Sequence, residues 1–198
     1  MSMTGASSGM ATSTPDSWIR SLGLQELQRT VGDVIRYVPR GESLPEETWE
    51  KRHRNILVLL LAHVPFLFAL GTFTGTDPYL TGADFVAVPL EHAVVGVGVL
   101  TAIAGVAWWS GLPRRVRASV SAVGLMTSSA LLVYFSGGFI EAHFHFFVVA
   151  GVIATYEDWL PFAVSILFVA AEHSLFGMTN PEAVYNHPDA VANPMGWG

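Results

Sequence analysis

The stretch "NILVLLLAHVPFLFALGTF", residues 55–73, is long and apolar enough to cross a lipid bilayer. A transmembrane helix needs about 20 predominantly apolar residues. Four more stretches have the same character, at residues 86–107, 118–135, 139–156 and 160–177. The whole chain is 51% apolar and 13% charged, which is too apolar for an ordinary soluble domain. The sequence therefore predicts an all-α fold, a polytopic membrane helical bundle with five spanning helices.

The basic residues predict the orientation of this bundle, because cytoplasmic loops of membrane proteins carry an excess of Lys and Arg. Seven of the ten Lys and Arg residues precede the first predicted span. The other three, Arg114, Arg115 and Arg117, fill the loop predicted between the second and third spans. The loops expected on the opposite side, 75–84 and 136–139, contain no basic residue. We therefore expect a multi-pass plasma-membrane protein with a cytoplasmic N-terminus.

The remaining segments divide the chain around this bundle. Residues 1–15 are rich in Ser, Thr, Gly and Met, which predicts a disordered tail. Residues 16–54 are expected to form a cytoplasmic amphipathic segment, with a helix over 24–38, and a linker. The bundle itself would occupy 55–177. Within it, Gly124 and Ser128 are four positions apart, which permits close helix approach, and Asp158 can cap the start of the helix over 160–177. Residues 178–198 would form an extracytoplasmic loop leading to a possible sixth helix, which is missing, so we expect a fragment of a longer protein.

Ionisable side chains gather in one half of the predicted spans. Helix rise places five histidines and three carboxylates between the bilayer midplane and the outer face, while the inner half has almost none. They are His63, His92, His143, His145, His173, Glu91, Glu141 and Glu172. A charge in hydrocarbon costs ~2.5–3.5 kcal/mol on insertion scales, so such groups should face the bundle interior. His187, in the outer loop, could reach over this cluster, whereas His53 lies at the inner interface without an expected role.

Four kinds of chemistry fit this cluster. The groups could hydrogen-bond helices together, hold a b-type haem through axial histidines, bind zinc, copper or iron, or line a proton path. A haem would use His63, His92, His143, His145 and His173. A metal site would draw on His92, His143, His145, His173, His187, Glu91, Glu141 and Glu172. In "HFH", His143 points largely away from the face shared by Glu141 and His145, so the two histidines cannot chelate one ion from one helix face.

Four segments carry a resemblance to a known family. They are "FSGGFIEAHFHFFV" at 135–148, "YEDWLPF" at 156–162, "EHSLFG" at 172–177 and "VYNHPDAVANPMGW" at 184–197. Residues 48–198 resemble the six-helix membrane module at the N-terminus of bacterial and haloarchaeal chemotaxis transducers, sensor kinases and diguanylate cyclases. The similarity is greatest to haloarchaeal aerotaxis-type transducers. The resemblance implies that the layer of ligand or cofactor residues comprises His63, His92, His143, His145, His173 and His187.

The sequence and the resemblance together predict a membrane sensor domain of a signal transducer. It would detect oxygen, redox state or a small ligand through haem b, or otherwise through a transition metal such as zinc or copper, with no catalysis required. The alternative is an intramembrane His/Glu metalloenzyme of the zinc-hydrolase kind or a proton-coupled carrier. A bundle without a cofactor is the third possibility. Expected partners are membrane lipid, a cytoplasmic signalling domain outside this chain and a second copy forming a homodimer, but no nucleic acid.

Overall fold

The computed structural model describes residues 44–76, 84–85 and 87–193, together with residues 26, 28–30, 32, 33, 36 and 39. The predicted disordered tail, residues 1–15, lies outside the described residues. The described residues between 26 and 36 are helical and exposed, in agreement with a helix over 24–38. The apolar face predicted for that helix falls on residues that the structure does not describe.

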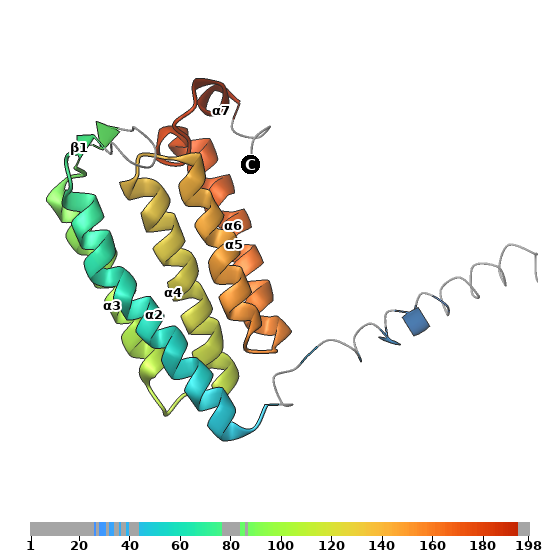
Figure 1. Cartoon of the computed structure of the whole chain (residues 1–198). Coiled ribbons are helices and arrows are strands. Elements are labelled where there is room, and N and C mark those ends of the chain that lie inside the picture. Colours follow the sequence, from blue (N-terminus) through green and yellow to red (C-terminus); the bar gives the residue numbers. More distant parts are fainter. Residues whose placement is uncertain are drawn as a thin grey trace, which may run out of the picture. The chain divides into compact units, whose positions relative to one another are not determined.

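Five consecutive helices run up and down beside one another in the bundle (Figure 1). They are α2 (Glu46–Thr72), α3 (Leu90–Trp108), α4 (Arg114–Phe135), α5 (Ile140–Ala154) and α6 (Trp159–Thr179). Each coincides with one of the five predicted apolar stretches. A short antiparallel pair, β1 (Gly75–Thr76) and β2 (Asp84–Phe85), joins α2 to α3. The 3₁₀ turn η1 (Pro181–Ala183) and α7 (Pro188–Ala192) follow α6.

The number of spanning helices is smaller than predicted when length is considered. Four helices, α2, α3, α4 and α6, are long and apolar enough to cross a membrane. The fourth predicted span, α5, is apolar but has only 15 residues, which corresponds to ~22 Å against a hydrocarbon core of ~30 Å. The chain is therefore a multi-pass membrane protein with four clear candidate spans and one short apolar helix.

Two helix starts differ from the prediction. Helix α2 begins at Glu46, well before residue 55, so part of the predicted linker is helix. Arg114, Arg115 and Arg117 belong to the first turn of α4 and not to a loop. Both differences arise because a helix can continue past its apolar run when the charged residues of its extra turns find partners. The predicted start of α6 is confirmed, since the Asp158 carboxylate accepts a hydrogen bond from the Leu160 N–H at 3.0 Å.

Helix α4 forms the centre of the bundle. It packs against α2, α3, α5 and α6, and it is the most buried of the four candidate spans. Its small residues permit this, as the sequence predicted for Gly124 and Ser128. A Cβ atom at Gly124 would meet Leu60 Cδ2 at 2.7 Å and Ile103 Cγ2 at 3.1 Å, so a larger residue there would force these side chains of α2 and α3 to shift.

The two ends of the bundle differ in chemistry. We call the end that carries Arg52, Arg115 and Arg117 the arginine end, and the opposite end, with His92 and His143, the histidine end. The β1–β2 pair, η1 and α7 all lie at the histidine end (Figure 1). Alternate helices of an up-and-down bundle start at opposite ends, which is why residues from five distant segments of the chain meet at each end.

Candidate functional site

A cavity of about 310 Å³ lies at the histidine end, between α5, α6 and the segment that follows α6. Its lining combines apolar side chains with several polar groups: Gly138, Ile140, His143, Val169, His173, Tyr185, Asn186, His187 and Ala190. Three of the histidines predicted for a site therefore meet at one cavity. Its volume is in the range of small-ligand sites, at ~300–1,000 Å³.

A tight turn between α4 and α5 closes one wall of this cavity. Gly138 has φ +78°, a left-handed conformation that favours glycine. Its carbonyl accepts a hydrogen bond from the Asn186 N–H at 3.1 Å. A Cβ atom at Gly138 would lie 2.8 Å from the carbonyl carbon of Tyr185. The "SGGF" sequence thus lets the segment after α6 lie directly against this turn.

His143 presents a bare ring nitrogen within this region. Its Nδ1 donates to the Phe139 carbonyl at 3.0 Å, which leaves Nε2 without a proton in the neutral ring. Nε2 is buried and has no hydrogen-bond partner among the described residues. The ring stacks on Tyr185, with ring centroids 6.1 Å apart and planes 4° apart. A buried acceptor without a donor is costly, so a ligand that supplies a donor or an electron-pair acceptor would stabilise this site.

His173 lies beside His143 on the neighbouring helix, with ring centroids 5.5 Å apart. Its Nδ1 lies 3.2 Å from the Val169 carbonyl and 2.6 Å from Glu172 Oε2. The carboxylate contact lacks hydrogen-bond geometry, and Glu172 Oε2 is otherwise buried without a partner. Burial raises the pKa of the Tyr185 hydroxyl, and the Glu172 charge raises it further. The lining of the cavity therefore includes His143, with a free electron pair on Nε2, and the Tyr185 hydroxyl, which carries a proton.

A second histidine pair joins α2 to α5. His63 Nε2 lies 3.1 Å from His145 Nε2. His63 Nδ1 donates to the Leu59 carbonyl at 2.7 Å, so its Nε2 accepts the Nε2–H of His145. His145 Nδ1 then accepts from the Ser129 hydroxyl at 2.8 Å. His143 and His145 therefore serve different neighbours, which confirms that the two histidines of "HFH" do not act from one helix face.

Of the other predicted site residues, His187 reaches the cavity, while His92, Glu91 and Glu141 lie apart from both groups. His92 Nδ1 is hydrogen-bonded to the Tyr134 hydroxyl at 2.7 Å, in an exposed position. Glu91 and Glu141 are exposed. His187 lines the rim of the cavity, and its Nδ1 accepts from the Asp189 N–H at 3.3 Å, where it caps α7. The predicted layer is therefore divided into a cavity, a histidine pair and several separate groups.

This geometry suits some of the expected cofactors better than others. A macrocycle held between two axial imidazoles needs their nitrogens ~4 Å apart, twice a metal–nitrogen bond of ~2.0 Å, and the His63 and His145 nitrogens are closer at 3.1 Å. His143 and His173 meet edge to face, again without room for a flat group between the rings. Across the described ranges, no three His, Asp or Glu side chains converge as a ready metal site. As placed, the histidines fit a smaller ligand better than a sandwiched haem.

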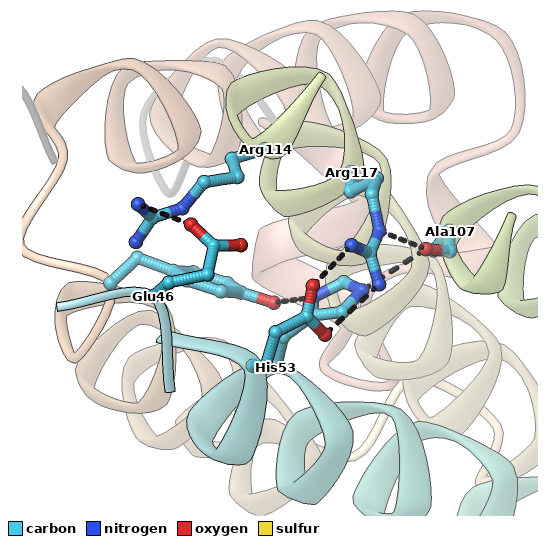
Figure 2. Close-up of polar contacts among 7 residues, drawn as sticks. Glu46, His53, Ala107, Arg114 and Arg117 are labelled. Carbon is cyan, nitrogen blue, oxygen red and sulfur yellow. Dashed lines mark hydrogen bonds and ion pairs between the residues drawn. The ribbon is translucent and has the colours of Figure 1, made fainter. Parts of the chain in front are cut away.

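The arginine end holds a polar network that sequence reasoning missed (Figure 2). His53 is fully buried. Its Nε2 donates to the Ala107 carbonyl at 3.0 Å, so its Nδ1 accepts from the Tyr156 hydroxyl at 2.7 Å. Burial raises the pKa of Tyr156, which keeps this hydroxyl protonated as a donor. His53 was assigned to the interface without a role because its partners are distant in the sequence.

Trp49 and two arginines complete this network. The Trp49 ring stacks on His53 at 4.7 Å between centroids, and the guanidinium carbons of Arg114 and Arg117 lie 4.9 and 5.0 Å from the Trp49 ring centroid. Arg117 Nη1 donates to Glu50 at 2.7 Å, and Arg114 pairs with Glu46 at 3.1 Å (Figure 2). Cation–π contacts of this kind contribute ~0.5–2 kcal/mol. The charged groups of this network lie in the first turns of α2 and α4, outside the spans predicted from residues 55 and 118.

Comparison with known proteins relates this arrangement to signalling. Over 172 residues, 87% of its length, the chain is 46% identical to transducer protein Htr8 of Halobacterium salinarum. The chain is a homologue of a haloarchaeal transducer. It spans 27% of the length of that relative. No family model matches the chain. No solved structure matches it either.

Proposed function

We propose that this chain is the membrane sensor region of a signal transducer and that the cavity beside His143 and His173 receives what it detects. The similarity to Htr8 supports the transducer assignment. The four candidate spans support a role in the membrane. We further propose a cytoplasmic N-terminus, because the described basic residues of the bundle lie at the arginine end; they are Lys51, Arg52, Arg54, Arg114, Arg115 and Arg117. Output would pass to a cytoplasmic signalling domain or partner.

The observation that carries this proposal is the bare, buried Nε2 of His143 beside the cavity. In the neutral ring this nitrogen offers an electron pair and no proton, and the Glu172 carboxylate lies nearby, against His173. The chemistry that matches is a ligand that accepts electron pairs. It would be a transition-metal ion such as zinc or copper, or a small molecule with hydroxyl or amino donors. His143 and His173 each donate Nδ1–H to a backbone carbonyl, which is the usual support of a metal-binding imidazole.

The first experiment is a composition analysis of the full chain purified in detergent. Absorbance spectra of the oxidised and reduced protein reveal a haem, elemental analysis reveals a metal, and mass spectrometry of a denatured extract reveals an organic ligand. His143→Gln removes the bare nitrogen at the cavity. The matched control is His92→Gln, because His92 lies at the same end but outside the cavity.

The expected result is a stoichiometric metal or small molecule in the wild-type protein and in His92→Gln, with at least a tenfold loss in His143→Gln. A Soret band would restore the haem hypothesis and require the histidine pairs to separate on binding. Equal occupancy in the two variants would contradict the proposed site. If all three proteins lack any bound group and bind neither Zn²⁺ nor Cu²⁺, the histidines only join helices, and the sensor proposal fails at this cavity.

A further inference from the structure

A groove of about 740 Å³ lies between α2 and α5 and opens at the arginine end. Helix α5 packs mainly on α4, whereas α2 packs on both α3 and α4. The walls deeper in the groove are apolar, from Ile56 and Leu59 on α2 and Gly151 and Val152 on α5. Its mouth is polar, from Arg52, Asn55, Thr155 and Glu157. The groove is thus amphipathic along its length.

Two polar bridges cross this groove and connect α2 to α5 and to the residues just after α5. At the mouth, Arg52 pairs with Glu157 at 2.8 Å. Toward the histidine end, His63 meets His145. Arg52 and His63 are eleven positions apart on α2, which corresponds to ~16 Å along the helix. Between these two bridges the groove is open at Gly151, because a Cβ atom added there would have no neighbour within 4 Å.

The mouth has donors in excess of acceptors. Only Nη1 of Arg52 is engaged, by Glu157 and the Thr155 carbonyl. Among the described residues, none accepts from its Nε or Nη2, although a guanidinium has five N–H donors. Its side chain is 34% exposed. Lys51 and Arg54 lie on the same turn and are exposed, so the local charge is positive despite Glu157.

We propose that this groove binds a membrane phospholipid, with the phosphate at Arg52 and Asn55 and one acyl chain along Ile56, Leu59 and Gly151. A basic pocket between membrane helices is a known arrangement for anionic headgroups. An apolar trough that begins at a helix end and continues into the bundle fits the tail of the same molecule. A second copy of this chain would also bring apolar side chains to the trough, and the test below separates it from a lipid. This inference does not depend on the sensor proposal.

The test uses a matched pair of glycine variants. Gly151→Leu fills the groove, while Gly105→Leu places the same side chain on α3, also in open space and also about one turn from the arginine end. Replacing a helical glycine favours the helix in both cases. Native mass spectrometry of the full chain then measures binding of dioleoyl phosphatidylglycerol, of dioleoylglycerol, which lacks the phosphate, and of inorganic phosphate.

We expect phosphatidylglycerol to bind the wild type and Gly105→Leu equally, and Gly151→Leu at least tenfold more weakly. Arg52→Gln should also weaken this binding, whereas Lys51→Gln should not. The proposal is overturned if Gly151→Leu and Gly105→Leu bind alike, or if dioleoylglycerol binds as tightly as phosphatidylglycerol. Binding of inorganic phosphate with the same affinity would assign the mouth to a free anion. A dimer that Gly151→Leu dissociates, with no lipid adduct, would assign the groove to a second copy.

Discussion

Replacing Tyr156 by Phe tests the buried network at the arginine end. The Tyr156 hydroxyl donates to His53 Nδ1 at 2.7 Å, and both side chains are fully buried. Phe preserves the ring and creates no large void, so the main loss is the donor. A buried acceptor left unsatisfied costs ~1–3 kcal/mol. We therefore expect Tyr156→Phe to lower the free energy of unfolding by about that amount, up to ~100-fold in the unfolding equilibrium at 1.4 kcal/mol per factor of ten.

The matched control is Tyr134→Phe. Tyr134 also contacts a histidine through its hydroxyl at 2.7 Å, but that histidine, His92, is exposed. Water or lipid headgroups can replace the lost donor there, so the change should remain within ~0.5 kcal/mol. The two variants therefore remove the same atom from the same kind of hydrogen bond in buried and exposed settings.

The assay is reversible unfolding in mixed micelles with increasing dodecyl sulfate, followed by circular dichroism. The reasoning is refuted if Tyr156→Phe costs less than ~0.5 kcal/mol, or if it costs no more than Tyr134→Phe. Either result would mean that His53 finds another donor or that the network does not restrain α2. A tyrosinate absorbance change near neutral pH in the wild type would also contradict the raised pKa of Tyr156.

Two further substitutions test local features of each end. Gly138→Ala should lower the free energy of unfolding by more than ~1 kcal/mol and reduce ligand occupancy of the cavity, because its Cβ would collide with the backbone after α6. Gly137→Ala is the control: with φ +77° and open space, it should cost only the backbone strain of ~1 kcal/mol. Equal effects of the two variants on stability and on occupancy would contradict this. Asp158→Ala should cost at least the ~0.5–2 kcal/mol of the α6 cap. Asp158→Asn keeps the cap but loses the charge that Arg115 contacts with two N–H groups at 2.8 and 2.9 Å, so it should cost less than Asp158→Ala. Equal losses in the two variants would contradict a stabilising role of the cap.

The helices were predictable because each is written locally in the sequence. Apolar runs marked all five, Asp158 marked the start of α6, and Gly124 marked a close helix contact. The predicted spans differ from the structure in the length of α5 and in the charged first turns of α2. Helix α5 stays helical at 15 residues although it is short for a span, and α2 extends into a charged segment because Glu46 and Glu50 find arginines on α4.

The side-chain partners were not predictable, because they depend on how distant helices face one another. Helix periodicity placed His143 and His145 on different faces but did not choose between the possible pairings. The structure pairs His145 with His63, which is 82 positions away, and His143 with His173. His53 shows the same limit, since its partners Ala107 and Tyr156 lie 54 and 103 positions away. A "KRHR" run contains no sign that its histidine is buried.

The arrangement suggests how a ligand at the cavity would affect the far end of the bundle. His143 and His145 lie within one turn of α5, so a rotation of α5 that repositions His143 against Tyr185 also moves His145 relative to His63 on α2. Helix α4 is packed on most sides and resists such motion, whereas α2 and α5 are separated by a groove. A change in the distance between His63 and His145 would therefore move α2 and α5 relative to each other. The Arg52–Glu157 pair spans the same groove at the arginine end. A ligand that shifts α5 would therefore also strain or release that ion pair. A lipid bound in the groove would change the free energy needed for this shift.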